Sequence, residues 1–194
     1  MSQNFLQDQC SGFLNTPPLW ENREFGIQQF EFPVLDLESF HAQPIPQNIR
    51  LGHQMEYVFK QLLDYSSDYE VLLHNLPIKD EKRTLGEIDF ILKNLQTQKL
   101  IHVELTCKFY IINPEIKTPL QQLIGPNKRD LFFAKMEKIR DQQFPLLHTP
   151  EGIKALENHG IAVNKLAHQC CFKAQLYVSY GDKKTNLNPL TKNC

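Results

Sequence analysis

The stretches GEIDFIL (residues 86–92) and LIHVELTCKFYII (residues 100–112) decide the fold. In both, apolar residues alternate with polar ones, as in a strand whose successive side chains point to opposite faces. We therefore predict a strand at Gly86–Leu92, a turn at Asn94–Lys99 and a longer strand at Leu100–Ile112. Two such neighbouring strands are expected to form the centre of a sheet.

Helical and strand patterns alternate on either side of these two strands. Apolar residues recur at helical spacing between Leu51 and Ser66, which predicts a helix. Further patterns predict helices at about Gln3–Leu14, Asn127–Gln143 and Glu151–His159, strands at Glu70–Asn75 and Phe172–Ser179, and a hairpin turn at Ile78–Thr84. This order predicts a mixed α/β (α+β) fold in which helices flank a central mixed sheet.

Length and composition indicate one globular domain with two flanking segments. The 194 residues suffice for one core. The proline-interrupted residues 1–48 predict a short helix and an extended arm packed on a core domain at residues 49–182, followed by a flexible tail at 183–194. No apolar run reaches the length of a membrane span, and the start MSQNFLQDQ does not resemble a signal peptide. Five cysteines without C-x-x-C spacing favour a reducing cytoplasm.

Two acidic residues inside the predicted strands carry the functional argument. Asp89 and Glu104 lie in strands whose alternate positions are apolar, where an unpaired carboxylate is costly. A shared cation explains the pair best, because Mg²⁺ takes one or two carboxylates plus waters and substrate phosphate. Thr106 and Lys108 share the face of Glu104, because strand side chains repeat every second residue.

This set of side chains fits metal-assisted hydrolysis of a phosphodiester. Carboxylates hold the metal, the metal polarises the phosphate and lowers the pKa of a bound water, and a lysine assists. Asp89 and Glu104 would bind the metal, Lys108 would assist the water or the transition state, and Thr106 would line the site. Glu56, at the margin of the apolar stripe of its predicted helix, could support a metal-bound water.

These motifs resemble the PD-(D/E)XK nuclease superfamily. More closely, the chain resembles an uncharacterised bacterial domain-of-unknown-function family placed in that superfamily, over most of residues 11–180 and through the blocks FLNTPPLW, RLGHQMEYVFKQLL, RTLGEIDFIL, HVELTCKFYI and LIGPNKRDLF. The resemblance implies a restriction-endonuclease-like fold, with the motif aspartate at Asp89, the motif glutamate at Glu104 and the helical acidic residue at Glu56. The superfamily's lysine usually lies two residues after the glutamate, where this chain has Thr106, so Lys108 is expected to replace it.

Polar residues after the second strand are candidates for substrate contact. Asn127 is expected to cap a helix, which puts Lys128 and Arg129 in its first turn, where cations are disfavoured unless they face an anion. Lys135 would extend this basic surface. Gln122 or its neighbour Gln121 would contact the phosphate or the attacking water, as glutamines after the core motif do in related nucleases.

The sequence therefore predicts a nuclease that uses Mg²⁺ (or Mn²⁺) and acts on DNA, without a membrane and with its oligomeric state open. The formal net charge of −1 excludes a globally basic surface but allows a local basic groove. The alternative is a catalytically inactive module of the same fold that binds nucleic acid or a protein, which Thr106 at the usual lysine position favours.

Structural explanations compete at each candidate residue. The strand carboxylates could pair with Lys108 or lie exposed on an open face of the sheet. Glu56 could be a solvated helix flank, and the basic run could be a solvated helix face. A zinc site using His168, Cys170 and Cys171 lacks the paired spacing of structural zinc motifs.

Overall fold

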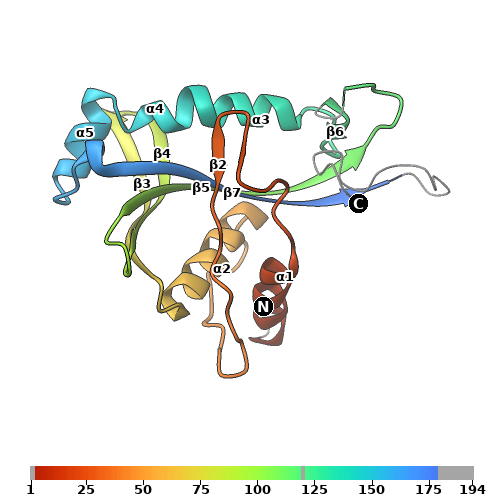
Figure 1. Ribbon diagram of the computed structural model, residues 1–194, viewed down its shortest axis with the longest axis horizontal. Coiled ribbons are helices and arrows are strands. Elements are labelled where there is room, and N and C mark those ends of the chain that lie inside the picture. Colours follow the sequence, from red (N-terminus) through yellow and green to blue (C-terminus); the bar gives the residue numbers. More distant parts are fainter. Residues whose placement is uncertain (1–2, 119–120, 179–194) are drawn as a thin grey trace.

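A computed structural model, which describes residues 3–118 and 121–178, has a mixed sheet at its centre (Figure 1). The strands are β1 (Arg23–Glu24), β2 (Ile27–Gln29), β3 (Tyr69–Asp80), β4 (Arg83–Asn94), β5 (Leu100–Ile112), β6 (Leu123–Ile124) and β7 (Leu166–Tyr177). Within this seven-stranded sheet the order is β1-β2-β7-β5-β4-β3, with β6 paired to β5. Because β3, β4 and β5 run antiparallel while β7 runs parallel to β5, the predicted mixed α/β class is confirmed.

Helices cover both faces of the sheet. On one face lie α1 (Gln3–Asn15) and α2 (Leu51–Tyr65), and on the other α3 (Phe132–Lys138), the π turn η2 (Ile139–Gln143), α4 (Phe144–Leu146) and α5 (Pro150–Glu157), as Figure 1 shows. A 3₁₀ turn, η3 (Val163–Lys165), leads into β7. The central strands are therefore buried on both sides, which explains their long apolar runs.

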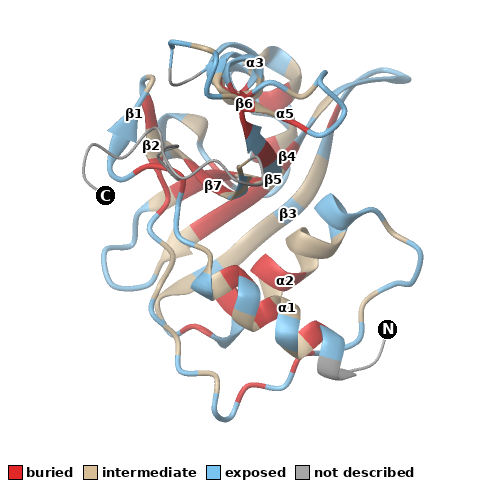
Figure 2. Cartoon of the chain, turned by 90° about the vertical axis from the view of Figure 1, so that its right-hand side faces the viewer, coloured by how far each residue is buried: buried red, intermediate tan, exposed pale blue. Residues whose placement is uncertain are grey.

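The buried side chains form three clusters, and Figure 2 shows the buried residues gathered between the layers. One lies between the sheet and α1 and α2, where the Phe59 and Phe90 rings are 4.7 Å apart. A second lies beneath α3, where Phe132 packs edge-on against Phe172. The third fills the space under α4 and α5. Strand β5 contributes Ile101 and Val103 to the first cluster and Tyr110 and Ile112 to the second, and the polar residues described below lie on its central part.

Several predicted elements are confirmed, and others need correction. The helix from Leu51 and the strand Leu100–Ile112 occur as expected. The hairpin turn predicted at Ile78–Thr84 is wrong in extent: β3 continues to Asp80 and β4 begins at Arg83, because the flanking residues pair across the hairpin. Strand β7 begins at Leu166, six residues before the predicted Phe172, since Leu166–Cys171 pairs with β5 although it lacks an alternating pattern.

The helix predicted from Asn127 is also wrong at its start. Helix α3 begins at Phe132, and Asn127 instead stabilises a turn, its Oδ1 accepting the backbone N–H groups of Arg129 (3.0 Å) and Asp130 (3.1 Å). Lys128 has a φ of 60°, which no helix allows. Lys128 and Arg129 are therefore not in the first turn of a helix, and the dipole argument for an anion there does not hold.

The N-terminal arm contributes β2, which the sequence did not reveal and which pairs in parallel with β7. The predicted tail at 183–194 lies outside the described residues. Across the described ranges, no helix combines the length and apolarity needed to cross a bilayer.

Candidate active site

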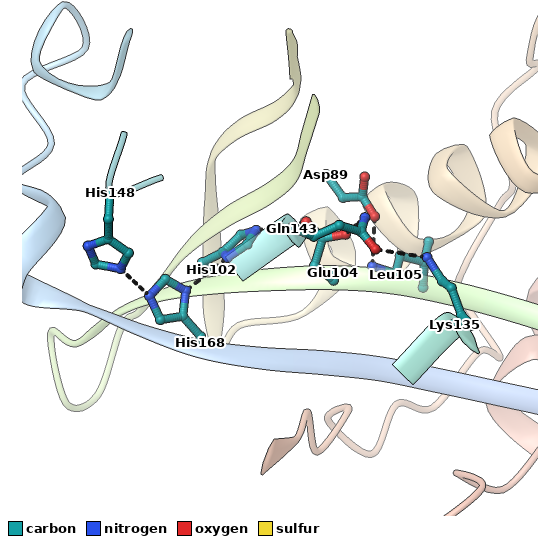
Figure 3. Close-up of polar contacts among 8 residues, drawn as sticks. All are labelled: Asp89, His102, Glu104, Leu105, Lys135, Gln143, His148 and His168. Carbon is teal, nitrogen blue, oxygen red and sulfur yellow. Dashed lines mark hydrogen bonds and ion pairs between the residues drawn. The ribbon is translucent and has the colours of Figure 1, made fainter. Parts of the chain in front are cut away.

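Asp89 and Glu104 lie side by side where strands β4 and β5 stop pairing. The antiparallel ladder runs from Lys93↔Leu100 to Phe90↔Val103 and then ends, so Asp89 and Glu104 would have been its next partners. Instead of the main chain of β4, the Asp89 carboxylate completes the contact, its Oδ2 accepting the backbone N–H of Leu105 at 2.9 Å (Figure 3). The end of the ladder thus brings two carboxylates together.

Both oxygens of Glu104 have partners, although its side chain is fully buried. A ring nitrogen of His102 lies 3.0 Å from Oε1. The side-chain amide of Gln143, from η2, donates to Oε2. A buried carboxylate needs such partners, because an unpaired one would have to become neutral.

The two carboxyl groups hold protons more tightly than exposed ones. Burial raises the pKa of Asp89, and the negative charge of Glu104 raises it further. Burial likewise raises the pKa of Glu104, opposed by the positive charge of Lys135 and the hydrogen bond from Gln143. Two adjacent buried carboxylates cannot both ionise easily, so the metal-free pair retains a proton that a cation would displace.

Lys135 supplies the cation of this cluster. It projects from α3 toward the carboxylates, half-buried, and its Nζ donates to Oε1 of Gln143 at 3.0 Å (Figure 3). Burial lowers the pKa of Lys135, and the charges of Glu104 and Asp89 oppose that effect. Two carboxylates, an ammonium and an amide therefore form one connected group.

The π turn η2 is what places Gln143 on the same side as Lys135. The two residues are eight apart, and at 3.6 residues per turn a regular helix would leave them about 80° apart around its axis. A π turn takes up an extra residue and is often found at functional sites. In this chain it rotates Gln143 back onto Glu104.

Glu56 approaches the cluster from α2 on the other side of the sheet. Its Oε2 accepts the Asn75 side-chain amide at 2.9 Å and lies 3.1 Å from Nδ1 of His53. Its negative charge also raises the pKa of Asp89. With these two partners and a side chain that is 17% exposed, Glu56 is not a freely solvated helix flank.

Lys108 is placed away from the carboxylates. Its Nζ forms an ion pair with Asp130 at 2.5 Å, and four residues of strand put it about 13 Å along β5 from Glu104. Thr106, between them on the same face, is buried, and its hydroxyl has no hydrogen-bond partner among the residues that the structure describes. Lys135, not Lys108, is the lysine that the fold brings to the pair.

The other predicted contact residues lie apart from this group. Gln122 donates to the carbonyl of Ile116 at 2.7 Å, and Gln121 is exposed nearby. Asn127, Lys128 and Arg129 are exposed in the turn before α3. Cys170 and Cys171 belong to clusters on opposite faces of the sheet, so they cannot join His168 as zinc ligands.

The donor atoms fit a hard divalent cation. Within the described part of the chain, no three His, Cys, Asp or Glu side chains are grouped to hold a metal, but Mg²⁺ needs only one or two carboxylates plus waters. Asp89 and Glu104 supply these.

Sequence reasoning missed Gln143 and the histidines that join Glu104. His102 was visible two residues before Glu104 on its strand face, which is a usable signal. The approach of Gln143 depends on the π turn and on how α3 docks, for which no local pattern exists.

Comparison with known proteins gives one match. The family model described as "Domain of unknown function (DUF1853)" matches residues 14–193. No curated protein and no solved structure matches the chain.

Proposed function

The chain belongs to the DUF1853 family, and we propose that it is a metal-dependent nuclease of the PD-(D/E)XK type that hydrolyses phosphodiester bonds of DNA. The observation that carries the proposal is the pairing of Asp89 with Glu104 at the end of the β4–β5 ladder, next to Lys135. Structural ion pairs rarely place two carboxylates together in a buried position with one lysine beside them.

The element order supports this proposal. A Glu-bearing helix α2 is followed by the strands β3, β4 and β5, the helix α3 and the strand β7 beside β5. Asp89 on the second of these strands and Glu104 on the third stand where the superfamily motifs put them in the sequence. The restriction-endonuclease-like assignment rests on this order together with the motifs.

Asp89 and Glu104 would hold Mg²⁺ or Mn²⁺, with Glu56 positioned for a metal-bound water. When bound, the ion supplies a lowered pKa for its water and polarisation of the phosphate. Cation binding would release the proton that the carboxyl pair retains. The two residues then stay ionised and stationary through the reaction.

Lys135 takes the part that strand alternation assigned to Lys108. Its ammonium lies within the electrostatic reach of both carboxylates, where it can orient the attacking water or stabilise the charge that develops on the phosphate. Gln143 orients Lys135 through its Oε1 and Glu104 through its amide.

A second candidate is a catalytically inactive module that binds nucleic acid or a protein. Thr106 at the usual lysine position favours it, as does the pairing of Lys108 with Asp130. In this case the carboxylate cluster would be a remnant without turnover.

A cleavage assay tests the proposal. The protein is incubated with linear, nicked and branched DNA, and with RNA, in Mg²⁺, in Mn²⁺ and in chelator, beside the variants Asp89→Asn, Glu104→Gln, Lys135→Met and Lys108→Met. Glu70→Gln, an exposed carboxylate on β3, is the matched control. We expect the first three variants to lose about 100-fold or more of the cleavage rate, and Lys108→Met and the control to stay within a few-fold.

Other outcomes discriminate between the candidates. Cleavage that persists in Glu104→Gln, or in chelator, contradicts the metal mechanism. If Lys108→Met loses cleavage activity while Lys135→Met keeps it, then Lys108 on β5, not Lys135, is the catalytic lysine. No cleavage of any substrate, with DNA binding that weakens steeply with salt, supports the inactive module.

A further inference from the structure

Three histidines connect Glu104 to the protein surface through consecutive hydrogen bonds. His102 contacts Oε1 of Glu104 at 3.0 Å through Nε2, and its Nδ1 lies 3.0 Å from Nδ1 of His168. His168 in turn places its Nε2 2.9 Å from Nε2 of His148. Figure 3 shows these rings in a row that leads away from the carboxylates to the exposed His148.

The row is assembled by three separate elements. His102 on β5 and His168 on β7 are register partners in the parallel ladder, so their rings meet on the same face of the sheet. His148 lies between α4 and α5. Phe144 stacks on His168 with 5.2 Å between ring centroids and meets His102 edge-on at 5.6 Å.

When Glu104 is ionised, it fixes which nitrogen donates and which accepts in each hydrogen bond along the row. A carboxylate only accepts, so His102 must carry its proton on Nε2, and its Nδ1 is left as an acceptor. His168 must then donate from Nδ1 and accept at Nε2. The donor for that last acceptor is Nε2–H of His148. A neutral imidazole has one N–H, and each ring uses it in this scheme.

The surroundings of the rings agree with neutral imidazoles. His102 is fully buried, and each of its ring nitrogens lies within hydrogen-bond distance of one partner, Glu104 or His168. Each ring nitrogen of His168 likewise faces one histidine nitrogen, of His102 or of His148. A neutral ring has one donor and one acceptor nitrogen, so neutral rings can form every hydrogen bond of the row. A doubly protonated ring has two donors and would direct one N–H at the N–H of its neighbour.

We infer that His102, His168 and His148 are positioning residues that hold Oε1 of Glu104 in a single orientation, opposite the Gln143 amide that holds Oε2. The role in metal binding rests on the proposed function, but the tautomers and the hold on Glu104 do not. A carboxylate fixed at both oxygens is preorganised for a cation, and outer partners of this kind typically contribute 10- to 100-fold to metal affinity.

The tautomers are measured first, in the metal-free full chain at a pH above the raised pKa values of both Asp89 and Glu104, by ¹⁵N–¹H correlation of the imidazole rings. We expect protonated Nε2 in His102 and His148 and protonated Nδ1 in His168. A proton on Nδ1 of His102 would leave Nε2 without a hydrogen to donate to Glu104, and this result would overturn the inference.

A pair of substitutions at His102 then tests the hold on Glu104. Gln places an amide nitrogen near the position of Nε2 and can keep the donation to Glu104, whereas Asn reproduces only the Nδ1 side. The side-chain amide resonance of Gln143 reports on Oε2, because that amide donates to Glu104. We expect this resonance to move in His102→Asn and to stay in place in His102→Gln.

His168 offers a test at a residue that does not contact Glu104. His168→Phe keeps the stacking on Phe144 but removes both hydrogen bonds, while His168→Asn keeps a donor toward His102. His159→Gln, exposed in the loop after α5, is the control. We expect Mn²⁺ affinity, measured by calorimetry, to fall about 10-fold in His102→Asn and His168→Phe and to change little in the other variants.

The failures are distinguishable. A wild-type chain that binds neither Mn²⁺ nor Mg²⁺ contradicts the proposed function, while the tautomers and the Gln143 resonance still decide the histidine row. Normal metal binding together with an unchanged Gln143 resonance in His102→Asn and His168→Phe overturns the inference and leaves the proposed function standing.

Discussion

Asp89 and Glu104 bind protons more tightly in the folded protein than in the unfolded chain, and this difference makes the stability of the protein depend on pH. Burial raises the pKa of Asp89 to about 8 and that of Glu104 to about 7, compared with values near 4 in an unfolded chain. A raised pKa in the folded state adds stability that is fully present below about pH 4 and is lost as the pH rises through the raised values.

We therefore expect the metal-free protein to lose stability between about pH 4 and pH 8, and Asp89→Asn to remove much of that loss. Mg²⁺ needs the ionised pair, so at 100 times its Kd it should stabilise the wild type at pH 8 by about 2.7 kcal/mol and do less at pH 5. Thermal unfolding of both proteins, with Glu70→Gln as the control, measures this. If the unfolding temperatures of the wild type and of Asp89→Asn change with pH in the same way, the raised pKa values are contradicted.

The residues of the site differ in how far the sequence predicts them. Asp89 and Glu104 follow from strand alternation, because a period of two fixes which side chains share a face. The same rule placed Lys108 on the face of Glu104 but could not show that Asp130 would pair with it. Lys135 was predicted for substrate contact, and its approach to the carboxylates depends on the docking of α3, which no local pattern encodes.

At the scale of elements, the α4–α5 corner holds the outer end of the histidine row. Gly152 lies in the first turn of α5, whose N-cap Thr149 accepts its N–H at 3.1 Å. A Cβ at Gly152 would lie 2.2 Å from the carbonyl oxygen of Leu146 and 2.9 Å from Cα of Leu147. Because these are backbone atoms, α5 would have to move away from the segment that carries His148.

Gly152→Ala should accordingly lower the free energy of unfolding by about 1–3 kcal/mol, as overpacked sites do, and shift the ring resonances of His148. Gly12→Ala is the matched control, since a Cβ on that face of α1 meets nothing within 4 Å and helix propensity should add up to about 1 kcal/mol. Urea denaturation compares the two. Equal stability of Gly152→Ala and wild type would show that α5 can move away from Leu146 and Leu147 at little cost in free energy.

Element boundaries show the limit of periodic patterns. Helix α2 and strand β5 were predictable because each keeps one period over its whole length. The helical pattern from Asn127 to Gln143 hides a turn, a short helix and a π turn, so a single 3.6-residue period misplaced its start and could not show that Gln143 turns toward Glu104. The start of β7 was missed because Leu166–Cys171 shows no alternation of polar and apolar residues, and this segment is a strand because it pairs with β5.

At the scale of the whole molecule, the N-terminal arm joins the two layers of helices around the edge of β7. Helix α1 buries Phe13 against Phe59 on one face, and Trp20 packs on Phe132 and Phe172 on the other. Between them Phe30 donates its N–H to the carbonyl of Cys170 at 2.8 Å. The arm thus contributes to the core that supports α3 and, through it, Lys135.

Lys173 makes the core depend on this arm. Its ammonium is buried on β7 and donates to the carbonyls of Phe13 (2.7 Å) and Thr16 (2.6 Å), with the Phe13 ring 4.6 Å away. These carbonyls end α1, where a cation is favoured by the helix dipole. Without the arm, Lys173 would face an exposed apolar surface and β7 would present an unpaired edge.

A chain that starts at residue 49 should therefore fail to fold cooperatively, rather than yield a trimmed core. We expect it to lose near-ultraviolet circular dichroism and to aggregate, because it lacks the arm's share of two hydrophobic clusters. The full chain with Lys173→Met separates the two causes: it removes the buried charge but keeps the arm, and should stay folded. A fragment that unfolds at the wild-type temperature would show that the arm only covers a core that is stable by itself.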